Sequence, residues 1–439
     1  GQTIDMQVSV ENTGGLERRL TVQVPGEEIQ QKIESKLREL SKQVRVKGFR
    51  PGRVPMSVVK QRYGKQVRFD IVNETMQASL QEAIREQDLR PASMPRLDGE
   101  PEDIEGGAVE FKALIEVYPE IGDISVGEIS MDKPEVAISD GDVEEMLETL
   151  RKQRRVWEEV ERKAEKGDQV VLDYSAEGPD GRVPEEGTSH MQIVMGESGF
   201  TKLESALIGL KAGDEKSVKL NFPEDFRNPS LAGQKATIDV KVDTVSSGDL
   251  PEVDEEFVKG FGVEDGELDS LKTEIRGNLE RELKQAETGV IKARMIDELF
   301  KVTPDLEVPK SIVRDEASAL ARQMIQQPDQ EPDPQVVEIF MDQAESRVRA
   351  GLLMGEIASQ NDIQVDALKV RETIETLAST YEQSDEVVQL YYGNPNMLQQ
   401  VESAVLEEQV VDWVLENAKV TPKKTSFQEV IAAATNSGE

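Results

Sequence analysis

The sequence of 439 residues contains no cysteine, which excludes disulfide bonds, thiolate nucleophiles and zinc sites built on cysteine. It contains one histidine, His190, so we expect neither a His-based catalytic triad nor a cluster of histidine metal ligands. We assign His190 no role, and we expect no metal ion and no other cofactor.

Long apolar runs are also missing. No stretch approaches the roughly 18–20 apolar residues that a membrane span needs, and the N-terminus lacks the basic, apolar and small-residue order of a signal peptide. We therefore expect a cytoplasmic protein without a membrane partner. Residues 1–5, which precede Met6, are interpreted as the remnant of an expression tag. No GxxxxGK[ST] motif is present, so we expect no ATP-driven cycle.

Aromatic residues are scarce, at 4% of the chain, while charged residues make up 32%. This composition favours an elongated architecture of about three domains over one dense core. With 52 basic and 87 acidic residues the net charge is −35, which repels bulk nucleic acid. We expect no DNA binding, and any nucleic-acid contact must be made by a local basic segment.

One such segment exists. Between residues 36 and 68 there is a single acidic residue, Glu39, among eleven basic ones. Because salt screens charges beyond about 8 Å, a local cationic patch can act independently of distant acidic residues. The basic residues are Lys36, Arg38, Lys42, Arg45, Lys47, Arg50, Arg53, Lys60, Arg62, Lys65 and Arg68.

Residues 6–117 are predicted to form an α+β domain. Alternation predicts strands over 16–24 and 108–118. Apolar residues at helical spacing predict a first helix, which Gly48 can end, and the prolines and glycine that follow predict a loop. A short helix is expected from about Pro55 to Tyr63, ending at Gly64, and a second long helix over about 65–87.

The predicted secondary structure changes three times along the rest of the chain. Residues 118–159 are predicted to be a connector, extended at first and then helical. Residues 160–247 alternate short strands and turns around one short helix, which indicates a small sheet domain. Residues 248–427 are predicted to be a helical body, and residues 428–439 a frayed tail. We therefore expect a multidomain, elongated α+β chain.

The basic loop allows two interpretations. Phe49 could fill the core between two helices, with the cations as an ordinary solvated surface. Alternatively, Phe49 meets a partner and the arginines bind phosphate or carboxylate groups in bidentate fashion. The charge contrast favours the second interpretation, which is docking to a large polyanionic surface.

The stretch GFRPGRVPMSVVKQRYG (48–64) resembles the signature loop of the bacterial trigger factor family. Further matching motifs follow in the same order over almost the whole chain: EVYPEI (116–121), GFGVEDG (260–266), NLERELK (278–284), GLLMGEI (351–357) and VLEEQVVDWVL (405–415). The resemblance implies a ribosome-binding head, a prolyl isomerase domain of the FKBP type and an all-α C-terminal body that cradles substrates. It implies an ATP-independent chaperone that docks at the ribosomal exit tunnel, shields nascent polypeptides and is a homodimer when free.

In the family, this loop contacts a ribosomal protein beside the tunnel mouth and the adjacent rRNA. Pro51 stands where the family usually has lysine, and nearby cations can substitute for it. The resemblance assigns ribosome binding to Gly48, Phe49, Arg50, Pro51, Gly52 and Arg53, with Arg45 and Lys47 beside them.

The resemblance also assigns an apolar isomerase pocket, which needs no nucleophile. Its expected walls are Tyr174, Val183, Met191, Phe200, Leu203, Phe226 and Ile238. Val183 and Met191 stand where the family usually has phenylalanine, Leu203 replaces a larger aromatic floor, and Pro184 replaces an acidic residue. We therefore predict weak isomerase activity. The alternative is that these residues are simply the core of the sheet domain.

The helical body carries methionines, which suit surfaces that bind many partners but also pack in cores. These are Met295, Met324, Met341, Met354 and Met397. Two other functions compete with the chaperone prediction. The first is a prolyl isomerase as the main activity, and the second is an acidic holdase for basic clients such as free ribosomal proteins.

Overall fold

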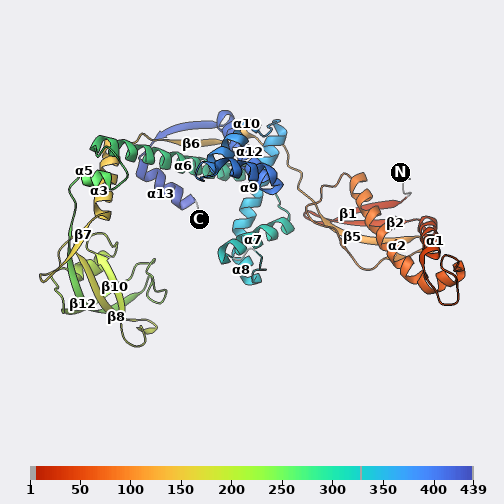
Figure 1. Ribbon diagram of the computed structural model, residues 1–439, viewed down its shortest axis with the longest axis horizontal. Helices are drawn as coiled ribbons and strands as arrows, with labels where there is room; N and C mark the ends of the chain where they lie inside the picture. The colour runs from red at the N-terminus through yellow and green to blue at the C-terminus, as the bar shows by residue number, and fades with distance from the viewer. Residues whose placement is uncertain (1–5, 327–328, 438–439) are drawn as a thin grey trace. The chain divides into compact units, whose positions relative to one another are not determined.

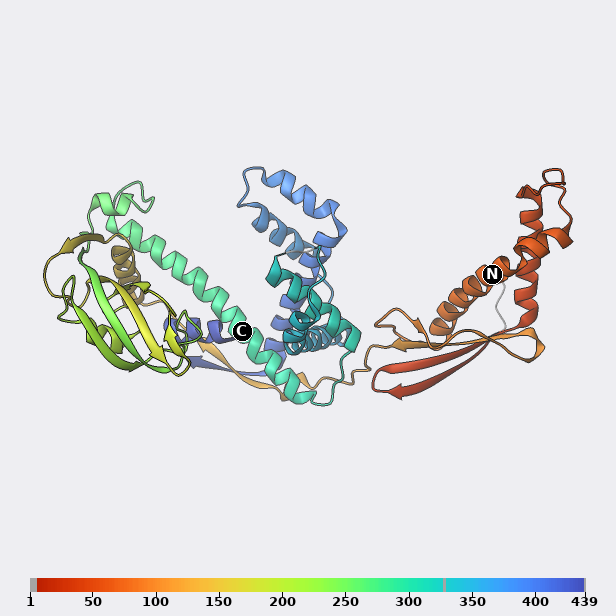
Figure 2. The same ribbon diagram turned by 90° about the horizontal axis from the view of Figure 1, so that it is seen from below.

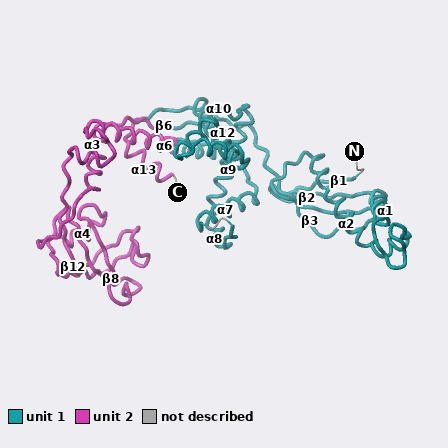
Figure 3. The backbone as a smooth tube through the Cα atoms, in the orientation of Figure 1, with its two compact units in different colours: residues 1–133, 291–423 teal, residues 134–290, 424–439 magenta. Residues whose placement is uncertain are grey.

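The computed structural model describes residues 6–326 and 329–437 (Figure 1), so the expected tag remnant at residues 1–5 lies outside the described residues. The chain divides into two compact units, residues 1–133 with 291–423 and residues 134–290 with 424–439 (Figure 3). Across the described ranges, no helix combines the length and the apolar character that crossing a membrane requires.

The head, residues 6–117, pairs an antiparallel sheet with two helices that cover one of its faces (Figure 2). Along β2 every second residue is buried, and these residues meet Phe111 and Ile115 in one core. The strands are ordered β1-β2-β5-β3, and β4 also pairs with β5. The elements are β1 (Gln7–Gly14), β2 (Glu17–Val24), α1 (Gly26–Gln43), α2 (Met56–Glu86), β3 (Arg96–Leu97), β4 (Glu102–Asp103), η1 (Glu105–Gly107) and β5 (Val109–Glu116).

The head differs from its prediction in three places. Strand β1 was not predicted: its apolar alternation is limited to Val8 and Val10, and nearly all its side chains are exposed. Helix α1 ends at Gln43, before Gly48, because Val44 is already extended. The two helices predicted on either side of Gly64 are one helix, α2. A glycine inside a helix costs only about 1 kcal/mol relative to alanine, and the apolar residues that α2 packs against the head core offset this.

In unit 2, a six-stranded antiparallel sheet spans residues 156–249, extending beyond the predicted domain of residues 160–247 because β7 takes in the end of the predicted connector. The order is β10-β8-β12-β11, with β7 on β12 and β9 on β8. Alternate residues of the central strand β8 are buried in one core with helix α4. The elements are β7 (Val156–Val160), β8 (Gln169–Gly178), β9 (Gly181–Val183), β10 (Ser189–Val194), α4 (Thr201–Leu207), β11 (Glu215–Asn221) and β12 (Lys235–Asp249).

The rest of unit 2 is helical. Helix α3 begins with a capping box in which Ser139 and Asp142 satisfy each other's backbone N–H groups. The first part of α6, within the predicted helical body, buries Leu271, Ile275 and Leu279, each four residues apart, as on the apolar side of an amphipathic helix. The elements are α3 (Asp140–Gln153), α5 (Glu255–Lys259), α6 (Leu268–Val302, shared with unit 1) and α13 (Phe427–Ser437).

The expectation of a frayed tail was wrong over most of its length. Residues 427–437 form helix α13, which buries Val430 in the core that α3 and α6 also form. Gln428 donates hydrogen bonds to Asp142 and Glu145 of α3. The tail has an apolar face, and tertiary contacts stabilise a helix that would be too short to persist alone.

The helical body of unit 1 has a core from α6, α9 and α12, and two satellite cores in the arms α7–α9 and α10–α12. Met295 and Met354 are core residues, whereas Met324 is exposed. The elements are η2 (Val126–Glu128), β6 (Ser130–Glu135), α7 (Lys310–Ile325), α8 (Pro334–Ile339), α9 (Met341–Gln360), α10 (Ala367–Ala378), α11 (Ser384–Gly393), α12 (Pro395–Asn417) and β13 (Lys419–Lys424), which pairs with β6.

The packing of α13 makes a testable prediction. Val430→Asp places an unpaired carboxylate in the core and should detach the helix, whereas Ala432→Asp adds the same charge to the exposed face. Hydrogen exchange of residues 427–437 should accelerate strongly in the first variant and little in the second. Equal exchange in the two variants would contradict the docking of α13.

Candidate functional site

The basic loop follows α1 and is fixed to the head at both ends. Val46 and Val54, on either side of the signature residues, are each 5% exposed and belong to the head core. Between them, Gly48 has φ 97° and Gly52 has φ 80°. Both values lie in the left-handed region, which favours glycine. The glycines of the signature are therefore required by the backbone path.

This path carries Phe49 away from the core. Its backbone N–H closes a turn onto the Val46 carbonyl (3.1 Å), and Arg53 closes a second turn onto Arg50 (3.0 Å). Phe49 is 42% exposed, so the interpretation in which it fills the two-helix core is wrong. The residues that fill that space are Val46 and Val54.

The loop cations are available to a partner. Arg45, Lys47, Arg50 and Arg53 are all exposed. Within residues 6–326 and 329–437, no acidic side chain lies within ion-pair distance of these four. Elsewhere in the basic segment, ion pairs form at Lys36, with Glu39, and at Arg68, with Asp103. The guanidinium and ammonium groups at the loop therefore keep their donors free.

All seven residues expected to wall the isomerase pocket lie in or against one apolar cluster in the six-stranded domain. They do not all reach the surface. Four of them are core residues, from 0% exposed at Leu203 to 8% at Phe200. The other three, Val183, Met191 and Phe226, are half-buried and form the accessible part of the cluster.

Aromatic rings contact one another inside this cluster. The ring centroids of Phe200 and Phe226 are 6.1 Å apart, and those of Tyr174 and Phe226 are 6.3 Å apart. Phe222, which the sequence reasoning missed, joins them at 4.8 Å from Phe226 and 5.5 Å from Phe200. In the sequence, Phe222 could have been found from its position at the end of a strand in NFPEDF (221–226), four residues before Phe226. Phe222 therefore belongs to the aromatic cluster on which the expected pocket is built.

Burial raises the pKa of the Tyr174 hydroxyl above its usual range, and a hydrogen bond with Ser189 partly opposes the shift. Tyr174 and Ser189 are cross-strand neighbours on β8 and β10. The next pair along these strands joins the exposed His190 to the half-buried Asp173, and their side chains are in contact. This pair lies on the sheet surface, outside the apolar cluster.

Two carboxylates hold the turn that leads to Phe200, and neither was identified from the sequence. Glu204 of α4 is 8% exposed and accepts hydrogen bonds from the backbone N–H groups of Gly196 and Ser198, both at 3.1 Å. Glu197 accepts two hydrogen bonds from Arg155, at 2.9 and 3.1 Å. The bonds from Arg155, more than any other contact, lower the pKa of Glu197. The turn is therefore ordered by charged groups rather than by apolar contacts.

The helical arms leave large apolar side chains uncovered. On the α10–α12 arm, Leu368 is 64% exposed, Tyr381 61% and Leu390 56%. On the α7–α9 arm, Ile339 is 74% exposed and Met324 is 58% exposed. Scattered exposed apolar residues are normal, and the head carries several of them too; those of the arms lie beside cores that are small.

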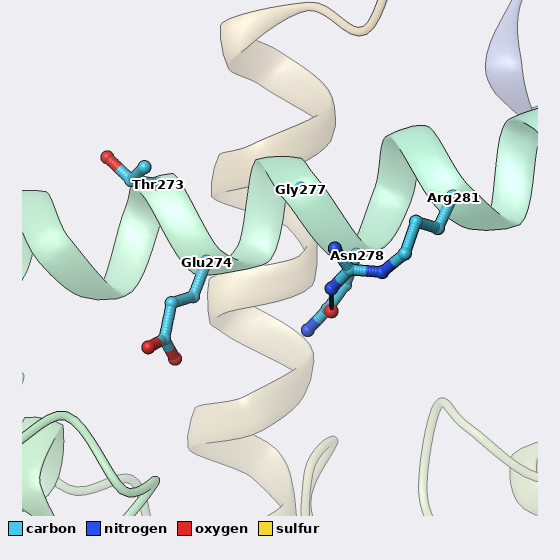
Figure 4. A pocket seen from close by; sticks show the side chains of 5 residues that line it. All are labelled: Thr273, Glu274, Gly277, Asn278 and Arg281. Carbon is cyan, nitrogen blue, oxygen red and sulfur yellow. Dashed lines mark hydrogen bonds between the residues drawn. The ribbon is translucent and has the colours of Figure 1, made fainter. Parts of the chain in front are cut away.

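A concavity of about 360 Å³ lies along α6, and Thr273, Glu274, Gly277, Asn278 and Arg281 line it (Figure 4). All of these residues come from one helix, and Arg281 donates a hydrogen bond to Asn278. The concavity has no converging polar groups from a second element, so we assign it no ligand. Nowhere in the described chain are three or more acidic or histidine side chains grouped so that they could hold a metal ion.

These parts define a modular binding protein: an α+β head with an exposed cationic loop, a separate sheet domain with an aromatic core, and helical arms with exposed apolar side chains. The comparisons with known proteins agree. Residues 6–150 match the family model described as bacterial trigger factor protein (TF), and residues 267–416 match the model of its C-terminus. Residues 160–243 match the FKBP-type peptidyl-prolyl cis-trans isomerase model.

The chain belongs to the bacterial trigger factor family. It is 42% identical to the trigger factor of Alcanivorax borkumensis over 97% of this chain and 98% of that one. It is 39% identical to the trigger factor of Stenotrophomonas maltophilia strain R551-3 over 97% of this chain and 100% of that one. A solved structure of the trigger factor chaperone aligns at 22% identity and a TM-score of 0.45, covering 93% of this chain and 99% of that one. The family assignment does not depend on that structure.

The predicted fold class is confirmed: an α+β head, an FKBP-type domain and a helical C-terminal body. The chain is accordingly a ribosome-associated chaperone that carries an FKBP-type domain.

Proposed function

We propose that the chain docks at the ribosomal exit tunnel through residues 45–53 and shields nascent polypeptides with its helical arms, without ATP. The observation that carries the docking proposal is the exposure of Phe49 among unpaired cations in an otherwise acidic chain. The phenyl ring would contact a ribosomal protein beside the tunnel, while the arginines would bind phosphates of the adjacent rRNA.

Phe49→Ala combined with Arg50→Ala is expected to abolish co-sedimentation with purified ribosomes at physiological salt, because the variant loses both the apolar contact and a phosphate contact. Suppression of client aggregation in solution should be unchanged, since the arms lie elsewhere in the chain. The matched control, Arg96→Ala with Leu97→Ala, removes an exposed cation and an exposed apolar residue from another part of the head. A double variant that still pellets at the wild-type level would contradict the docking assignment.

We infer that clients bind the exposed apolar residues of the arms. Unfolded chains present scattered apolar segments, and broad surfaces with acidic surroundings can hold and release them more readily than a deep pocket. Anchoring at the ribosome raises the local concentration of these surfaces near an emerging chain.

Tyr381→Gln with Leu390→Gln should weaken aggregation suppression roughly tenfold, equivalent to about 1.4 kcal/mol of apolar contact, and should leave ribosome binding intact. Met94→Gln with Leu97→Gln, on exposed residues of the head, serves as the control.

Raising the salt from about 0.1 to 1 M, which shortens the screening length from about 10 to 3 Å, should change wild-type suppression little. Suppression that collapses with salt would favour the acidic holdase for basic clients instead.

We propose weak prolyl isomerase activity for the FKBP-type domain. The amide barrier is about 18–20 kcal/mol, and an apolar site lowers it by desolvating the twisting bond. The half-buried residues Val183, Met191 and Phe226 are the part of the cluster that a prolyl ring can reach. The large helical body favours the chaperone over the isomerase as the main activity.

A protease-coupled assay with Xaa-Pro peptides should show a rate slightly above background, and Met191→Lys should remove it because the ammonium group enters the apolar surface. A chain lacking residues 160–247 should keep most of its aggregation suppression. Isomerase activity would be contradicted by a rate no higher than background, and that result would not bear on the chaperone function. Loss of aggregation suppression in the deletion variant would favour the isomerase as the main activity.

The family further suggests that the chain acts in the cytoplasm and is a homodimer in the absence of ribosomes. Sedimentation of the purified chain, with and without ribosomes, measures the second point directly.

A further inference from the structure

Phe69, on helix α2, is a second exposed aromatic residue that the docking loop does not explain. All eleven phenylalanines of the chain lie in the described ranges, and Phe49 and Phe69 are the two that are exposed. Phe69 is the more exposed of the two, at 62% against 42%. Both lie in or directly beside the one basic segment of an acidic chain, which makes a shared purpose the simplest explanation.

Packing of the head does not require Phe69. Helix α2 meets the head core through other residues, among them Val67 and Ile71 on either side of Phe69 in the sequence. Phe69 lies on the opposite, solvent-facing side of the helix. A large apolar ring there gains nothing from folding, because it is as accessible to water as many polar residues of the same helix.

Two cations precede Phe69 on this side of α2. Lys65 lies one helical turn before Phe69, and Arg62 lies one turn before Lys65, so each side chain neighbours the next along the helix. Both are exposed, and no ion pair involves either of them in the part of the chain that the structure describes. Arg68, by contrast, is held by Asp103 at 2.8 Å. Two unpaired cations, Arg62 and Lys65, therefore lie on the side of the ring, while Lys60, which is also exposed and has no ion pair in the described chain, lies on the other side of α2.

The patch ends at Phe69. The next residue, Asp70, accepts a hydrogen bond from Gln66 at 3.0 Å, and Glu74 follows one turn later. From the start of α2 at Met56 to Phe69 is about 20 Å at a rise of 1.5 Å per residue. The basic surface thus runs from the docking loop along α2 and finishes on an aromatic ring.

We propose that Arg62, Lys65 and Phe69 form a second docking point for RNA, in which the ring stacks on an unpaired base and the two cations bind the flanking phosphates. Single-stranded nucleic acid is the partner whose chemistry offers a regular anion and an exposed aromatic face together, and base stacking on an aromatic side chain tolerates any sequence. The inference rests on the proposed ribosome docking and extends it from the loop to the helix.

Phe69→Gln should weaken binding to purified ribosomes roughly 5- to 150-fold, the equivalent of about 1–3 kcal/mol for one stacked base, and Phe69→Tyr should restore it. Arg62→Gln with Lys65→Gln should lower the slope of log affinity against log salt by about 1.4, or 0.7 for each single-strand phosphate contact. Met94→Gln, an exposed apolar residue outside the basic segment, should have no effect. None of these positions is in the core, so each variant should fold.

A photo-reactive phenylalanine analogue at position 69 identifies the partner on the ribosome. Cross-links to rRNA support the proposal. Cross-links to a ribosomal protein, or to a second copy of the chain, overturn it. Wild-type ribosome affinity of Phe69→Gln also overturns it and leaves the loop proposal intact, because that proposal fails only if the Phe49→Ala, Arg50→Ala variant still binds.

Discussion

The proposed docking surface depends on a backbone constraint. Two glycines in the left-handed region, at positions 48 and 52, allow the chain to reverse twice between the buried anchors Val46 and Val54. A side chain at either glycine would be strained. Because Val46 and Val54 occupy the core, the loop between them lies at the surface. Phe49 and the neighbouring arginines are therefore exposed. The exposure of one ring thus results from the burial of two valines.

The charge distribution lets one acidic chain carry a cationic surface. The net charge is −35, yet the basic segment pairs with acidic side chains at its edges, through Lys36 and Arg68, and not at its loop. Screening beyond about 8 Å makes the loop and the outer side of α2 electrostatically local. The exposed apolar residues that we propose for clients lie on other elements, in the arms, so the two proposed kinds of binding do not compete for the same side chains.

The aromatic cluster of the FKBP-type domain is ordered from two sides. Leu203 is fully buried, and Phe222 packs against both Phe200 and Phe226. Glu204 and Glu197 fix the turn before Phe200 through hydrogen bonds to backbone N–H groups and to Arg155. Charged hydrogen bonds of this kind are stronger than neutral ones, so they hold the conformation of the turn.

Local pattern by itself determined much of this protein: the four-residue spacing of α6, the alternation in β2 and β8, and the loop built on Gly48 and Gly52. Only the tertiary structure decided that α2 continues through Gly64, that the last residues form α13, that Phe222 joins the aromatic cluster, and that Phe49 and Phe69 face solvent. Periodicity reflects backbone geometry, which neighbours in sequence set. Burial depends on which distant segments meet, and a single residue's surroundings are therefore fixed only when the whole chain has packed.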